Sequence, residues 1–102
     1  MQQNLFEGWD FDGTICHSPT GLRLRIFRFM EKFFPFITLI RRIKLRPVNP
    51  NILIITASSN KVGVVAWLKF HKIKYHSILF VSNFKDKEFF VKKLCWRYIE
   101  IE

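Results

Sequence analysis

The chain has 102 residues, of which 49% are hydrophobic and 17% aromatic, and it carries 17 Lys and Arg against eight Asp and Glu. This length suits one domain with a small core, and this apolar content excludes a disordered tail, a collagen-like repeat and a low-complexity linker. The net charge of +9 favours anionic partners such as nucleic acid, acidic lipid or a phosphorylated substrate, without choosing among them.

Strands and helices are expected to alternate along the chain. A strand over residues 5–12 precedes a turn at Gly13, and a long apolar and basic helix over 19–46 is divided or kinked by Pro35. The later elements are a strand over 52–55, a helix from Ser59 or Asn60 to Phe70, a strand over 78–81, a helix over 86–95 and a strand over 97–101. This order predicts one α/β domain over residues 1–102: a three-layer parallel sheet with helices on both faces and the site at the carboxyl ends of the strands.

Neither the cysteines nor the N-terminus indicates an extracellular protein. Cys16 and Cys95 are too few for a disulfide framework and lack metal-ligand spacing, so both are expected to be buried, reduced thiols. No signal peptide is visible, and the longest uncharged apolar run, residues 33–40, is much shorter than the ~20 residues of a membrane span. We therefore expect a cytoplasmic protein.

Two carboxylates stand at the predicted end of the first strand. Asp10 and Asp12 are two residues apart, so their side chains can face the same way, and Gly13 permits a sharp turn after them. Close carboxylates repel each other, and a divalent cation or a shared proton resolves the conflict. One of them can then act as a nucleophile and the other as an acid and base. The same spacing also suits two solvated acids beside a turn.

The residues around this pair match a known pattern. The string WDFDGTI at 9–15 resembles the first motif of the haloacid dehalogenase (HAD) superfamily of phosphotransferases, an apolar strand ending in Asp-x-Asp-Gly-Thr. The string ILIIT at 52–56, followed by Ala57 and Ser58, is similar to the second motif, an apolar strand ending in Thr or Ser. Lys87, with Lys85 as the alternative, is similar to the third, a Lys at the start of a later helix.

The resemblance implies a role for each matching residue. Asp10 would attack phosphorus and carry a transient aspartyl-phosphate, and Asp12 would protonate the leaving oxygen and then activate water. Thr56 would donate a hydrogen bond to the phosphoryl group and Lys87 would offset its negative charge. The further substrate contacts would be Thr14, which also stabilises the turn, and Ser58. Without the resemblance, the favoured interpretations are a helix cap for Thr56 and a solvated surface charge for Lys87.

The resemblance also implies Mg²⁺, held by the Asp10 carboxylate and the Asp12 backbone carbonyl. In the family a fourth motif, a strand ending in acidic residues, completes the metal site. The last predicted strand carries Glu100 and is followed by Glu102, which is better placed as the ligand. The alternatives are that both are ordinary surface acids or that the ligand is missing from this chain, which is then a minimal, truncated or decayed form of the fold.

The stretch between the first two motifs, residues 15–51, corresponds to a very small cap. It holds eight Lys and Arg, from Arg23 to Arg46, and one acid, Glu31, and so carries seven of the nine net positive charges. It would steer a phosphorylated substrate, lie on an anionic membrane surface, or form a crossover helix with its apolar side on the sheet. The crossover helix is favoured, with its inner face formed by Leu22, Ile26, Phe29, Met30, Phe33 and Ile37.

These observations favour a Mg²⁺-dependent phosphomonoester hydrolase. The alternative is a catalytically inactive HAD-like module that binds an anionic partner or membrane through the segment from Arg23 to Arg46. Nucleic acid is a less favoured partner of that segment because it contains no recognised binding motif. His17, close to the first motif, is a further candidate for substrate contact, and exposed sheet edges favour a homo-oligomer.

Overall fold

A computed structural model describes residues 6–100, apart from the Phe84 side chain. Its elements in chain order are β1 (Phe6–Asp10), α1 (Leu22–Phe33), the 3₁₀ helix η1 (Pro35–Ile40), β2 (Ile52–Thr56), α2 (Lys61–Phe70), β3 (Ser77–Phe80), α3 (Phe84–Leu94) and β4 (Cys95–Ile99). The alternation of strands and helices is therefore as predicted, although several boundaries differ.

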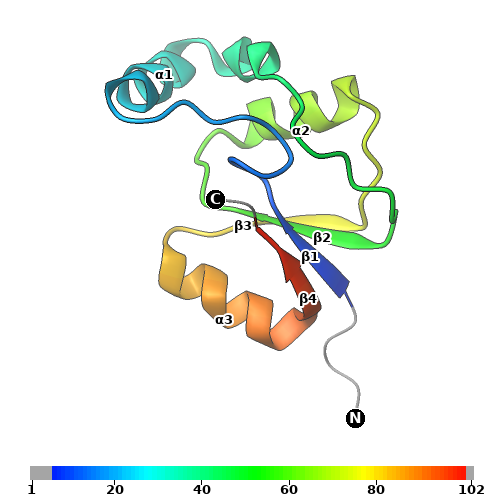
Figure 1. Cartoon of the computed structure of the whole chain (residues 1–102). Helices are drawn as coiled ribbons and strands as arrows, with labels where there is room; N and C mark the ends of the chain where they lie inside the picture. Colours follow the sequence, from blue (N-terminus) through cyan, green and yellow to red (C-terminus); the bar gives the residue numbers. More distant parts are fainter. Residues whose placement is uncertain (1–5, 101–102) are drawn as a thin grey trace.

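The four strands form one parallel sheet in the order β3-β2-β1-β4, with α2 and α3 on opposite faces (Figure 1). This arrangement confirms the predicted parallel α/β class. Asp10 pairs in register with Ile55 of β2, so the carboxyl ends of the two central strands lie side by side. The ends of β1 and β2 therefore bring Asp10 and Thr56 to the same edge of the sheet.

The core has two halves, one on each side of the sheet. Because side chains alternate along a strand, Ile52 and Ile54 pack with Trp67 and Leu68 of α2, whereas Leu53 and Ile55 pack on the α3 side. Every residue of β2 is buried, as expected for an all-apolar strand covered on both faces. Cys16 and Cys95 are free, buried thiols, as predicted.

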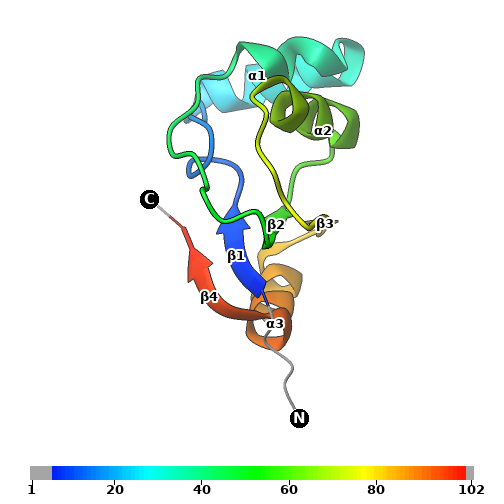
Figure 2. The same ribbon diagram turned by 90° about the vertical axis from the view of Figure 1, so that its right-hand side faces the viewer.

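The prediction of one long basic helix over 19–46 covering the sheet is wrong. Pro35 divides it, as predicted, but α1 ends at Phe33, η1 follows at Pro35–Ile40, and residues 41–51 form no further helix. The side of the sheet that this helix was expected to cover is occupied by α2, while η1 packs on α2 and α1 packs on η1 (Figure 2). The predicted inner face of α1 is consequently exposed, from Leu22 to Phe33.

Other predicted boundaries shift by one or two residues. The first strand ends at Asp10 because the Phe11 carbonyl accepts hydrogen bonds from the backbone N–H groups of the following turn, which takes Asp12 off the strand. The later elements begin earlier than expected: β3 at Ser77, α3 at Phe84 and β4 at Cys95, directly after α3. The predicted strand residue at position 101 lies outside the described residues.

One side chain joins α1 and η1 to α2. The Asn60 side-chain oxygen caps α2 by accepting from the Gly63 N–H at 3.1 Å, while its Nδ2 donates to the Pro35 carbonyl at 2.8 Å and to Glu31 Oε2 at 3.0 Å. Thr38 also donates to the buried Glu31 carboxylate. The only acid of α1 thus serves to anchor the helix.

Gly63 is needed for this junction. A Cβ atom there would lie 2.5 Å from the Pro35 carbonyl oxygen and 2.2 Å from Asn60 Nδ2. We expect Gly63→Ala to lower the free energy of unfolding by about 2 kcal/mol, although Ala is the better helix former, because η1 must move away. Urea denaturation measures this loss. Val62→Ala, an exposed position on the same helix, is the control, and a Gly63→Ala variant as stable as the parent chain would contradict the prediction.

Candidate active site

Asp10 is a buried carboxylate at the end of the central strand β1, only 7% exposed. Its Oδ1 accepts a hydrogen bond from Lys87 Nζ at 2.6 Å, and its Oδ2 accepts a long one from Thr14 at 3.4 Å. Burial raises the pKa of Asp10 above its ordinary value, and the hydrogen bond and charge of Lys87 oppose that rise. An ionised Asp10 therefore depends on the cation beside it.

Lys87 comes from a distant part of the chain. It lies in the first turns of α3, which begins where the Asn83 side chain accepts from the Asp86 N–H at 2.9 Å. Burial by itself would lower the pKa of Lys87, but the hydrogen bond to Asp10 and the Asp10 charge raise it overall. Glu100, after β4, lies 3.5 Å from the same ammonium group. Lys87 is therefore a buried, charged partner of Asp10 rather than a solvated surface lysine.

Asp12 lies in the turn after β1 and is only partly buried. Its Oδ1 is ion-paired with Arg41, and its Oδ2 accepts from Thr56 Oγ1 at 3.2 Å. Thr56 in turn accepts from the Ser58 N–H at 3.1 Å. The Asp12 charge contributes to the raised pKa of Asp10, so the two carboxylates act on one another electrostatically.

Arg41 is a site residue that the sequence analysis missed. Its backbone carbonyl accepts from Trp67 Nε1 at 3.0 Å, and its guanidinium lies 4.8 Å from the Phe27 ring centroid and 3.6 Å from Cys16 Sγ. Burial by itself would lower the pKa of Arg41, but Asp12 raises it overall, while burial raises the pKa of Cys16 to about 11. No spacing signal separates Arg41 from the other basic residues of 15–51.

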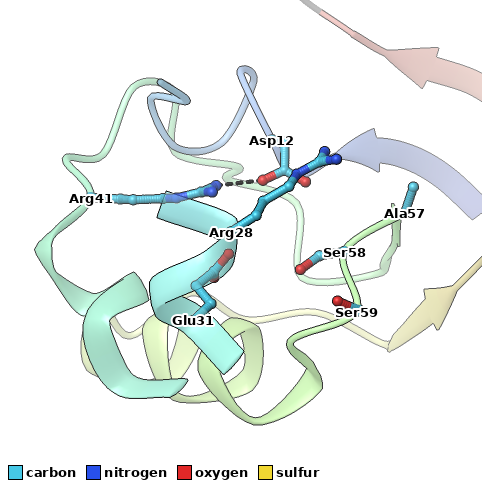
Figure 3. Close-up of a pocket in the computed structure, with 7 residues that line it drawn as sticks. All are labelled: Asp12, Arg28, Glu31, Arg41, Ala57, Ser58 and Ser59. Atoms are coloured by element: carbon cyan, nitrogen blue, oxygen red, sulfur yellow. Dashed lines mark hydrogen bonds and ion pairs between the residues drawn. The ribbon is translucent and has the colours of Figure 1, made fainter. Parts of the chain in front are cut away.

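A polar cavity of about 80 Å³ opens beside Asp12. A single water needs roughly 10–15 Å³, so the cavity has room for a small oxyanion or several waters. Figure 3 shows Arg28 extending from α1 along this cavity and Arg41 bonded to Asp12. The lining residues are Asp12, Arg28, Glu31, Arg41, Ala57, Ser58 and Ser59. Its hydroxyl groups and two guanidinium groups suit an anionic ligand.

The donor set suits a hard divalent cation as an added component. Asp10 and Glu100 both contact Lys87, so one ammonium group faces two carboxylates, while Asp12 is paired with Arg41. Carboxylate and carbonyl oxygens are the ligands that Mg²⁺ takes, and Asp10 Oδ2 accepts a long hydrogen bond from Thr14. Among residues 6–100, no cluster of three or more His, Cys, Asp or Glu residues forms a metal cage.

The structure brings some predicted residues together and separates others. Asp10, Thr14 and Lys87 form one hydrogen-bonded group, and Asp12 with Thr56 forms a second. Ser58 lines the cavity, while Thr14 is buried against Asp10 and does not line it.

The remaining candidates lie elsewhere. Lys85 is exposed, which leaves Lys87 as the lysine of the site. His17 is exposed and lines a different, more open hollow with Arg23 and Phe27. Glu100 reaches Lys87, and Glu102 lies outside the described residues.

A scan against protein-family models and searches of curated proteins and of solved structures found no match to this chain. The candidate site is therefore defined by its own geometry.

Proposed function

We propose that this chain is a small HAD-like, Mg²⁺-dependent phosphomonoester hydrolase that acts through an aspartyl-phosphate on Asp10. The observation that carries the proposal is the pairing of the buried Asp10 carboxylate with Lys87, 77 residues away, at the carboxyl end of a parallel strand. A carboxylate kept ionised in a buried position is suited to act as a nucleophile. Active sites of parallel α/β sheets lie at this edge.

The proposed reaction has two steps. An Asp10 oxygen forms a bond to phosphorus as the bond from phosphorus to the leaving oxygen breaks. Asp12, which must first leave its ion pair with Arg41 and take up a proton, donates that proton to the leaving oxygen. Water then attacks the phosphorus of the acyl phosphate, Asp12 accepts a proton from it, and the Asp10 carboxylate is regenerated as inorganic phosphate leaves. Lys87 and Thr56 stabilise the negative charge on the equatorial oxygens throughout.

The cavity supports this assignment because its basic groups match the substrate's charge. Arg28 and Arg41 line it together with Asp12, whereas Asp10, Thr56 and Lys87 are not among its lining residues. A phosphomonoester dianion would therefore meet Asp12 first, between two guanidinium groups. Mg²⁺ would be held by Asp10 and the Asp12 carbonyl, and when bound it would neutralise negative charge on the phosphoryl group. Glu100 contacts Lys87, the partner of Asp10, and is the candidate for the third protein ligand within the described residues.

The proposal is tested by hydrolysis of an aryl phosphate such as p-nitrophenyl phosphate. We expect turnover in the presence of Mg²⁺ that EDTA abolishes and that added Mg²⁺ restores. Acid-quenched protein should carry one phosphoryl group on Asp10, detectable as a mass increase that hydroxylamine removes, since acyl phosphates react with this nucleophile. A folded protein that shows neither turnover nor phosphorylation with Mg²⁺ present would overturn the proposal and leave the non-catalytic alternative.

A further inference from the structure

Helix α1 presents its most apolar side to solvent. The four residues Leu22, Ile26, Phe29 and Phe33 follow the spacing of one helical face, and each is between 51% and 71% exposed. The buried residues of the helix, Phe27 and Glu31, lie on the opposite side, against η1 and Asn60. This outer stripe (Leu22, Ile26, Phe29 and Phe33) therefore faces away from the rest of the protein.

Two residues of the outer stripe are in direct contact, since the ring centroids of Phe29 and Phe33 lie 5.2 Å apart. After Phe33 the chain adds further large apolar side chains that are between 58% and 69% exposed, namely Phe34, Phe36 and Ile40. An apolar patch on a domain surface indicates a binding site more strongly than scattered single residues do.

Cations border the outer stripe on both sides. Arg25 and Lys32 lie two turns apart along one flank, and Arg23 lies on the other flank. All three are exposed, and the helix has no acidic residue in its first turn. Its single acid, Glu31, is buried on the inner side, so no negative charge of α1 faces solvent.

We propose that α1 binds an anionic lipid surface, lying flat with its outer stripe among the acyl chains and its flanking cations among the headgroups. An apolar face bordered by Lys and Arg is the arrangement by which interfacial helices bind acidic membranes. Within residues 6–100, no helix is long and apolar enough to cross a bilayer. This inference goes beyond the proposed hydrolase activity and does not depend on it.

Two other occupants fit the same surface less well. A nucleic acid would contact cations and stack on aromatic rings, but it would leave the aliphatic side chains of Leu22 and Ile26 in water. A second copy of this chain would bring the same cations against one another, because the flanks of α1 carry no exposed acid. An acidic lipid surface offers acyl chains to the outer stripe and negative headgroups to the cations beside it.

The proposal is tested by co-sedimentation with sucrose-loaded vesicles of phosphatidylcholine, with or without roughly 30% phosphatidylserine. We expect binding only to the anionic vesicles, weakened when salt is raised from about 0.05 to about 0.5 M. Phe29→Ser/Phe33→Ser should lower the partition coefficient by about tenfold or more because it removes buried apolar area. Arg25→Gln/Lys32→Gln should lower it by about tenfold.

Matched controls distinguish vesicle binding through the outer stripe from nonspecific binding by other exposed residues. Phe89→Ser on α3, which is 57% exposed on the other side of the sheet, and Lys69→Gln/Lys74→Gln should bind as the parent chain does. Asp10→Asn should also bind normally, so a failed hydrolase assay leaves this inference standing. The thermal unfolding of each variant checks that its fold is intact.

Three results would overturn the inference. One is a folded parent chain that does not bind anionic vesicles. Another is vesicle binding that persists in Phe29→Ser/Phe33→Ser and is displaced by a single-stranded oligonucleotide, which would assign the cations to nucleic acid. The third is a dimer in sedimentation velocity that the stripe variant dissociates while vesicle binding stays absent, which would assign the surface to a second copy.

Discussion

Asp10→Asn is expected to lower the turnover of an aryl phosphate by roughly a thousandfold or more, as the loss of a covalent nucleophile does. The amide oxygen of Asn is a poor nucleophile, yet it still accepts a hydrogen bond from Lys87, so the local geometry is retained. Steady-state kinetics at saturating Mg²⁺ measures the effect. The mass increase of the phosphoryl-enzyme should disappear in the same variant.

The matched control is Asp86→Asn, which makes the same chemical change at the exposed start of α3. This variant should retain the parent turnover. If folded Asp10→Asn kept more than about a tenth of the parent rate, Asp10 would be excluded as the nucleophile, because such a loss is too small for this role.

Lys87→Met is expected to lower the free energy of unfolding by about 3–5 kcal/mol near neutral pH, because it leaves the Asp10 carboxylate buried without its cation. Burial already raises the pKa of Asp10, and Lys87 is what opposes the rise. When folding raises the pKa of a carboxyl group, the protein loses stability as the pH rises from the ordinary pKa of that group to its pKa in the folded state. Removing Lys87 raises the pKa of Asp10 in the folded state further, so the pH interval over which stability is lost extends to higher pH.

The free energy of unfolding that Lys87→Met loses relative to the parent chain should therefore be small at about pH 4. This loss should grow towards about pH 7.5, where Asp10 must ionise. Lys87 itself stays charged at both pH values because its pKa is raised, mainly by Asp10, so the trend follows the ionisation of Asp10 alone. Urea midpoints at the two pH values measure the trend. Lys85→Met, an exposed lysine of the same helix, is the control, and an equal deficit at both pH values would contradict the pairing.

The sequence was sufficient to predict the features that depend on local pattern and order. The all-apolar run before Thr56 predicted a strand buried on both faces, and β2 is that strand. Asp10 was expected at the carboxyl end of the first strand, and Lys87 at the start of the third helix. Their contact follows from the topology, because β4 returns beside β1 and brings α3 onto its face.

Features that depend on which helix packs against the sheet, or on contacts between distant elements, were not predictable from the sequence. The apolar spacing of α1 is what a sheet-covering helix has, and nothing in it indicates that α2 occupies that place. Arg41 reaches Asp12 because Trp67 fixes its backbone from another helix, a contact between residues 26 apart with no local signature. Ser59 or Asn60 was predicted as the helix cap, and Asn60 is the cap, but its bonds to Glu31 and Pro35 require knowledge of how η1 docks.

Because α1 and η1 dock on α2, they form a part of the molecule that is distinct from the sheet. The proposed chemical groups Asp10, Thr56 and Lys87 are carried by the sheet and α3, whereas α1 and η1 are joined to that body through Asn60 and Gly63. Residues 22–40 can therefore diversify without disturbing strand register. Natural variation in this segment, or deliberate exchange of it, would change what reaches the proposed active site and leave Asp10, Thr56 and Lys87 in place.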